Sequence, residues 1–147
     1  MPRVENTIVI PDVDLAKVWD VMCSFEAFPS LMADVVSVKC FDHDGANLKS
    51  NWVVLLNGSE LIWEEQDVFV HHKEIRFHQI DGDLEVWEGI WTIHQDGPDV
   101  VVSLTVDFDI GIPSLAEILH PIGERAINAN TRQMLGAIKG TSKELAL

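Results

Sequence analysis

The stretch Asp99–Ile110, DVVVSLTVDFDI, is followed after Pro113 by a sequence with a different hydrophobic period. In the first stretch every second residue is apolar, which predicts a strand with one buried face. After Pro113 apolar residues recur at intervals of three and four, from Leu115 to Ile138, which predicts a long amphipathic C-terminal helix. We expect Pro121 to kink this helix or to separate its first turns.

The residues before Asp99 show the same alternation in several segments. They predict strands at 35–42, 47–56, 59–70, 73–80 and 84–94, after a first strand at 6–10. Short turn signals separate the later strands: Asp44-Gly45, Asn57-Gly58, His71-His72, Asp81-Gly82 and Asp96-Gly97-Pro98. Connections of this length favour antiparallel hairpins over parallel crossovers.

Two short helices are expected between the first strand and position 35. Asp12 and Asp14 can cap a helix that carries Leu15, Val18, Trp19 and Met22, and residues 24–32 predict a second helix broken at Pro29. The predicted fold class is therefore α+β: a curved antiparallel sheet of about seven strands that buries one face against the C-terminal helix.

Length and charge limit the possible functions. The chain has 147 residues, which is the size of a single domain, and a formal net charge of -14. Such a charge disfavours binding to nucleic acids and to anionic membrane surfaces. Because no apolar run is long enough for a signal peptide or a membrane span, we expect a cytoplasmic protein. Cys23 and Cys40 are expected to be free thiols rather than a disulfide.

Titratable residues occur within two neighbouring predicted strands. In 59–70 the odd positions are bulkier, so that Glu65 and Asp67 are expected to point inward among aromatic residues. Arg76 and His78 share one face of 73–80, and pairing with the two carboxylates across the sheet would allow general acid–base chemistry. The alternative is a ladder of charges on the solvent face, and the alternation leaves both arrangements open.

Several motifs together resemble those of the polyketide cyclase/dehydrase (aromatase/cyclase) family of the START-like, or Bet v 1-like, superfamily. The resemblance covers nearly the whole chain. It rests on the segments 18–20 (VWD), 25–32 (FEAFPSLM), 61–64 (LIWE), 75–79 (IRFHQ), 87–91 (WEGIW), 106–109 (VDFD) and 130–134 (NTRQM). It implies the helix-grip fold, in which a sheet curved around a long helix encloses a cavity for a hydrophobic ligand.

The resemblance also implies a chemistry. In aromatase/cyclases the cavity promotes aldol cyclisation and dehydration of a poly-β-ketone without a metal or organic cofactor, and an acyl carrier protein delivers the substrate. The family's pocket arginine and tyrosine align with Phe69 and Val35, whereas its second basic residue corresponds to Arg76, and the sequence contains no tyrosine. The available polar groups, and our predicted catalytic residues, are Glu65, Asp67, Arg76 and His78. The predicted ligand-binding residues are Phe28, Met32, Trp63, Phe69, Trp87, Trp91, Leu104, Val106, Phe108 and Asn130.

Three functions follow from this reading. The first is a cyclase, aromatase or dehydrase that acts on a polyketide-type intermediate by acid–base catalysis, in which Arg76 polarises a carbonyl group. The second is a non-catalytic carrier of a hydrophobic small molecule, such as a lipid, an isoprenoid quinone or a pathway intermediate. The third is a structural or regulatory protein with a filled cavity. Because the chain is acidic overall, an acyl carrier protein would need a local basic patch for docking, formed by Arg132, Lys139 and Lys143.

Both a monomer and a dimer are compatible with the sequence.

Overall fold

The computed structural model describes residues 2–56, 58–109 and 116–145. Its strands form one antiparallel sheet with the order β1-β7-β6-β5-β4-β3-β2. The elements in chain order are β1 (Arg3–Ile10), α1 (Leu15–Cys23), a 3₁₀ turn (Phe25–Ala27), α2 (Phe28–Leu31), β2 (Val35–Asp44), β3 (Asn47–Leu56), β4 (Ser59–Val70), β5 (Glu74–Gly82), β6 (Val86–Asp96), β7 (Asp99–Asp109) and α3 (Ala116–Leu145). The predicted fold class is confirmed. β1 pairs with β7 and forms one edge of the sheet, and β2 forms the other edge.

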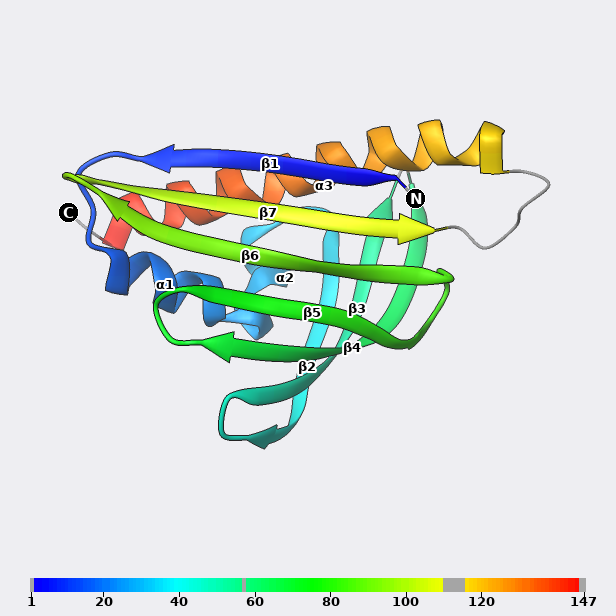
Figure 1. The fold of residues 1–147 in the computed structure, drawn as a ribbon, viewed down its shortest axis with the longest axis horizontal. Coiled ribbons are helices and arrows are strands. Elements are labelled where there is room, and N and C mark those ends of the chain that lie inside the picture. The colour runs from blue at the N-terminus through cyan, green and yellow to red at the C-terminus, as the bar shows by residue number, and fades with distance from the viewer. Residues whose placement is uncertain (1, 57, 110–115, 146–147) are drawn as a thin grey trace.

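The sheet is strongly curved, and α3 packs against its inner face (Figure 1). The direction of the strands changes between β7 and β2, while α3 lies along β1 and β7 with α1 near its C-terminal end. As predicted, alternate residues of β7 from Val100 to Phe108 are buried. They pack in the same core as Ile127, Leu135 and Ile138 of α3, so the change of period after β7 separates the two layers of the fold.

The helices differ from the predictions in three details. Asp14 is the N-cap residue of α1, but its side chain makes no capping hydrogen bond. The break within residues 24–32 lies before Phe28 rather than at Pro29, because proline is compatible with the first turn of α2, where its missing N–H has no helical partner. Helix α3 is a single element that includes Pro121, so the predicted separation of its first turns is wrong. The predictions for Ile110, Pro113 and Leu115 lie outside the described residues.

One predicted turn is displaced, and the displacement affects the register beside the candidate site. Gly82 remains in β5 opposite Trp63, where a β-carbon would lie 2.5 Å from the β-carbon of Trp63. The pairing then shifts, since Glu64 lies opposite Asp81 but Glu65 lies opposite Gln79. This β-bulge places one additional residue in β5 and raises the local twist of the sheet. The described residues of the other turns agree with the predictions, with positive φ at Gly45, Gly58, Gly97 and His72, whereas Asn57 lies outside the described residues.

No helix in the described part of the chain is long and apolar enough to cross a membrane.

Candidate active site

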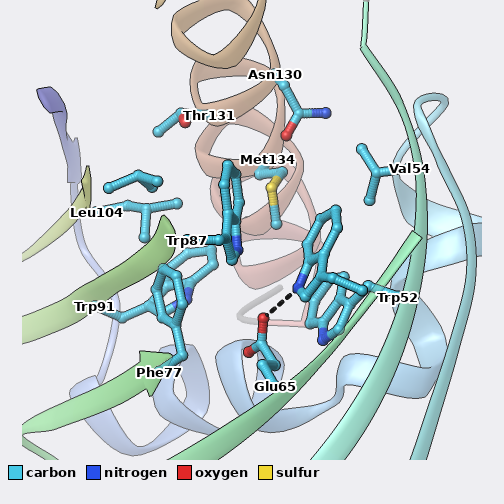
Figure 2. A pocket seen from close by; sticks show the side chains of 12 residues that line it. Trp52, Val54, Glu65, Phe77, Trp87, Trp91, Leu104, Asn130, Thr131 and Met134 are labelled. Atoms are coloured by element: carbon cyan, nitrogen blue, oxygen red, sulfur yellow. Dashed lines mark hydrogen bonds between the residues drawn. The ribbon is translucent and has the colours of Figure 1, made fainter. Parts of the chain in front are cut away.

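A small cavity lies between the curved sheet and α3 (Figure 2). Every strand from β3 to β7 contributes to its wall, and α3 closes it from the other side. The lining residues are Trp52, Val54, Trp63, Glu65, Phe77, Trp87, Trp91, Leu104, Val106, Asn130, Thr131 and Met134. Its volume, taken as the space open to the centre of a water-sized sphere, is about 30 Å³. That space holds about two water molecules.

Indole rings occupy most of the space inside the sheet. The rings of Trp52 and Trp63 are parallel with centroids 6.0 Å apart, and the centroid of Trp87 lies 4.8 Å from that of Trp63. Phe77 contacts Trp87 on the side of β5. The wall of the cavity is therefore largely aromatic, and a ligand of more than a few heavy atoms requires some of these rings to move.

A hydrogen-bonded chain of buried polar groups lies among the rings. Ser50 of β3 is directly opposite Glu65 of β4, and Asp67 follows two residues later on the same inner face. Trp52 Nε1 donates to Ser50 Oγ at 2.8 Å, and Ser50 Oγ donates to Asp67 Oδ2 at 2.5 Å. Trp63 Nε1 donates to Glu65 Oε1 at 2.7 Å, the contact that is drawn as a dashed line in Figure 2.

The Glu65 and Asp67 carboxyls lie close enough for each to shift the pKa of the other. Burial raises the pKa of Glu65 well above its usual 4.5, and the hydrogen bond to Asp67 and the charge of Asp67 raise it further, whereas the hydrogen bond from Trp63 lowers it. Burial also raises the pKa of Asp67, while the hydrogen bonds to Glu65 and Ser50 lower it. The buried Asp67 Oδ1 has no hydrogen-bond partner among the described groups. Burial therefore favours the protonated form of both carboxyls, and that of Glu65 more than that of Asp67.

No cationic side chain of the described residues lines the cavity. Two adjacent buried carboxylates without a cation repel each other strongly, which favours a state in which the pair holds a proton. Glu65 lines the cavity, whereas Asp67 is fully buried behind it. The predicted inward orientation of both residues is confirmed.

The prediction that Arg76 and His78 contribute to the cavity is wrong. Alternation along β5 buries Ile75 and Phe77, so that Arg76 and His78 point to the outer face of the sheet. The side chain of Arg76 is 66% exposed, and its Nε donates to Glu74 Oε2 at 2.5 Å. The solvent-face alternative is correct for β5, whereas the inward alternative is correct for β4.

Six of the predicted ligand-binding residues line the cavity: Trp63, Trp87, Trp91, Leu104, Val106 and Asn130. Four do not, because they are packed elsewhere in the core. Phe28 contacts Phe25 and Trp52, and Phe69 contacts Trp19 and Phe25. Met32 and Phe108 are buried in the same hydrophobic core without reaching the cavity wall.

Several site residues were not predicted from the sequence. Ser50, Trp52 and Val54 alternate along β3, and this period of two could have shown that they share the inner face. Phe77 could have been found in the same way. Thr131 and Met134 lie on the buried side of α3, where helical spacing separates core from surface but not cavity from core.

The two cysteines are free, as predicted. Burial raises the pKa of Cys23 to about 12 and that of Cys40 to about 11, so neither is a thiolate at neutral pH. In the described part of the chain, no three His, Cys, Asp or Glu side chains come together in an arrangement that could hold a metal ion.

The curved sheet, the long C-terminal helix and the cavity between them define a helix-grip protein of the START-like, Bet v 1-like class. Residues 11–135 match the family described as polyketide cyclase / dehydrase and lipid transport, and the chain belongs to that family. No curated protein sequence matches the chain.

Solved structures with the same fold include three that match almost end to end. The protein TTHA0849 from Thermus thermophilus has a TM-score of 0.91 at 22% identity, with 99% of this chain and 100% of that chain covered. The Zhui aromatase/cyclase from Streptomyces sp. R1128 has a TM-score of 0.87 at 17% identity, with 97% and 94% covered. A START superfamily protein from Mycobacterium smegmatis has a TM-score of 0.81 at 15% identity, with 97% and 98% covered.

Proposed function

We propose that the protein is a cyclase or dehydratase that removes a proton next to a carbonyl group of a compact hydrophobic substrate. The observation that carries the proposal is the Glu65–Asp67 pair: Glu65 lines an aromatic cavity, Asp67 lies behind it, and burial raises the pKa of both carboxyls. In this proposal the pair holds one proton at neutral pH. Membership of the polyketide cyclase/dehydrase family supports the reaction class, and by analogy the substrate is a polyketide-type intermediate. A substrate of that size enters the cavity only when aromatic rings of the wall move, so the proposal begins with the reaction on a compact ketone.

The charge of the pair favours proton removal as the first step. Donating its proton first would leave two buried carboxylates, which the apolar surroundings disfavour, whereas accepting one leaves the pair neutral. The substrate's α-C–H bond breaks, its electrons form an enolate, and the proton goes to Glu65 as the earlier Glu65 proton passes to Asp67. The enolate then either forms a carbon–carbon bond with a second carbonyl carbon or expels a β-hydroxyl group.

In both reactions the neutral pair returns one proton. In cyclisation the proton goes to the new alkoxide, and in dehydration it leaves with the hydroxyl group as water. The pair ends with the single proton with which it began, so the carboxyls act catalytically.

The test is exchange of α-protons for deuterium in small ketones, followed by proton NMR in D₂O. Acetone, cyclohexanone and acetophenone form a series of increasing size. We expect the protein to accelerate exchange at neutral pH, and we expect the rate to fall as the pH is lowered through the raised pKa of Asp67, because the pair then carries two protons. Heat-unfolded protein at the same concentration is the control for unspecific catalysis by carboxylates.

The second candidate function is a carrier without catalysis, and the crowding of the cavity by indole rings favours it because little space is left for a productive substrate geometry. Ketones that bind without any exchange above the unfolded control would overturn the enzymatic proposal and support the carrier.

A further inference from the structure

The wall of the cavity is rich in aromatic rings, and no cationic side chain of the described residues lines it. Its rings, which we call the aromatic cage, are those of Trp52, Trp63, Phe77, Trp87 and Trp91. Figure 2 shows Trp87 and Trp91 on one side of the space and Trp52 on the other. Because the faces of aromatic rings are negative, a space enclosed by several rings attracts a positive ion that has left water.

Two acceptor oxygens face the space from opposite sides. Glu65 lies at the sheet side, where its Oε1 accepts from Trp63 Nε1 at 2.7 Å and has a second lone pair. Asn130 lies at the helix side, with its amide oxygen turned into the cavity. Both residues are buried, at 4% and 8% exposure. A ligand that lies between them therefore needs N–H or O–H donors.

Hydrogen bonds and ring contacts hold the cage and the carboxyl pair in a fixed arrangement. Nε1 of Trp63 donates to Glu65, and Nε1 of Trp52 donates to Ser50, which in turn donates to Asp67. Both indoles are thus tied to the carboxyl pair by their polar edges. A cage that is already ordered loses little conformational entropy when an ion binds.

The size of the cavity limits the ion. The space holds about two water molecules, so an ammonium ion and one water fill it while the rings stay in place. That water can accept from Trp87 Nε1, a buried donor without a partner among the described residues. A methylammonium ion also fits, with its methyl group in place of the water, whereas a tetramethylammonium ion is too large.

We propose that the cavity binds a compact ammonium ion, either ammonium itself or methylammonium, between Glu65 and Asn130 inside the aromatic cage. A buried ion is costly without a charged partner, and here the Glu65–Asp67 pair is that partner. Asp67 Oδ1 accepts no hydrogen bond from the described residues, so its charge is only partly compensated. The inference goes beyond the proposed function, because the ion is not a substrate of the ketone reaction and inhibits that reaction by occupying the cavity.

The experiment compares methylammonium chloride with methanol, which has the same number of heavy atoms but no charge. Tryptophan fluorescence measures both affinities at constant ionic strength in sodium chloride, and proton NMR follows the methyl resonance of the ligand. We expect methylammonium to bind at least about 10-fold more tightly, as a charge-assisted hydrogen bond provides, with an upfield methyl shift caused by the rings. Ammonium should displace methylammonium, and tetramethylammonium should not. Equal affinities for methylammonium and methanol, or no binding of methylammonium, would refute the site.

The double variant Glu65→Gln/Asp67→Asn removes the negative charge of the pair and keeps the shapes of both side chains. We expect its affinity for methylammonium to fall at least about 10-fold, while its affinity for methanol changes little. Glu60→Gln/Glu64→Gln is the matched control, because both of these residues lie on the other face of β4. A double variant that binds methylammonium as tightly as this control would contradict the role of the pair.

Incorporation of 5-fluorotryptophan tests the aromatic cage without a change of fold. Fluorine makes the face of each indole less negative and alters its size very little. We expect the affinity for methylammonium to fall about 3-fold and that for methanol to stay the same. Unchanged affinity for methylammonium, or an equal loss for both ligands, would contradict a cation site. Exchange of ketone α-protons, measured without ammonium salts, tests the proposed function separately.

Discussion

Replacing Glu65 by glutamine should reduce the protein-catalysed exchange of ketone α-protons at least about 100-fold, since a positioned general base contributes roughly 10²–10⁴ to a rate. Glutamine has nearly the same shape as the protonated side chain. Its carbonyl oxygen can accept the hydrogen bond from Trp63, and its amide can donate to Asp67, so the buried network is conserved. Only the ability to gain and lose a proton disappears.

Glu64→Gln is the matched control for this experiment. Glu64 is the preceding residue of β4 and points to the other face of the sheet, so the same chemical change occurs on the same strand outside the cavity. NMR exchange rates of the two variants at equal concentration give the comparison. Equal rates in Glu65→Gln and Glu64→Gln would remove Glu65 from the reaction.

The stability of the wild type should fall with rising pH in a manner that Glu65→Gln lacks. The folded protein keeps a proton on Glu65 at pH values where the unfolded chain has released it, so the folded state binds more protons and its stability decreases as the pH rises. The expected slope is about -1.4 kcal/mol per pH unit in the free energy of unfolding. It begins above pH 4.5 and ends at the raised pKa of folded Glu65.

Urea unfolding at a series of pH values measures this slope. The quantity measured is the difference between the wild type and Glu65→Gln, because titrating groups other than Asp67, whose pKa depends on Glu65, contribute equally to both. Glu64→Gln should retain the wild-type slope. Parallel stability curves for the wild type and Glu65→Gln would show that folding leaves the pKa of Glu65 unchanged.

The sequence was sufficient for the architecture because each element has a clear period. Alternation in Asp99–Asp109 and helical spacing in the last thirty residues separate sheet from helix without information about tertiary contacts. The differences from the prediction lie at Pro29, Pro121 and Gly82. At each of them a proline or glycine was expected to end or interrupt a helix or strand, but whether it does so depends on its position within that element. Gly82 is required by its close approach to Trp63, a contact with a distant part of the chain.

The site was predictable only in part, because the pairing register of neighbouring strands decides which side chains face the cavity. The odd positions of 59–70 indicated that Glu65 and Asp67 point inward, but the same analysis could not choose a face for Arg76 and His78. Only the pairing of β4 with β5 and the burial of Phe77 place those two residues outside. The pKa of Asp67 likewise depends on Ser50, which the β3–β4 register places on the inner face, where its hydroxyl donates to Asp67 Oδ2.

The structure shows what surrounds the two positions that align with the family's arginine and tyrosine. The positions that align with the family's arginine and tyrosine, Phe69 and Val35, belong to the packed core, and no cation of the described residues reaches the cavity. Without a nearby cation, burial favours the protonated forms of the two carboxyls. The cavity wall without an arginine and the raised pKa values of Glu65 and Asp67 therefore agree with each other.

The most direct test of this account is an NMR titration of the carboxyl groups in protein labelled with ¹³C at glutamate and aspartate side chains, with Glu65→Gln used for assignment. We expect the Glu65 carboxyl to show the chemical shift of the protonated form at pH values well above 4.5 and to respond to Asp67 as one coupled pair. A Glu65 carboxyl that titrates at its usual pKa would contradict the shared proton and the mechanism built on it.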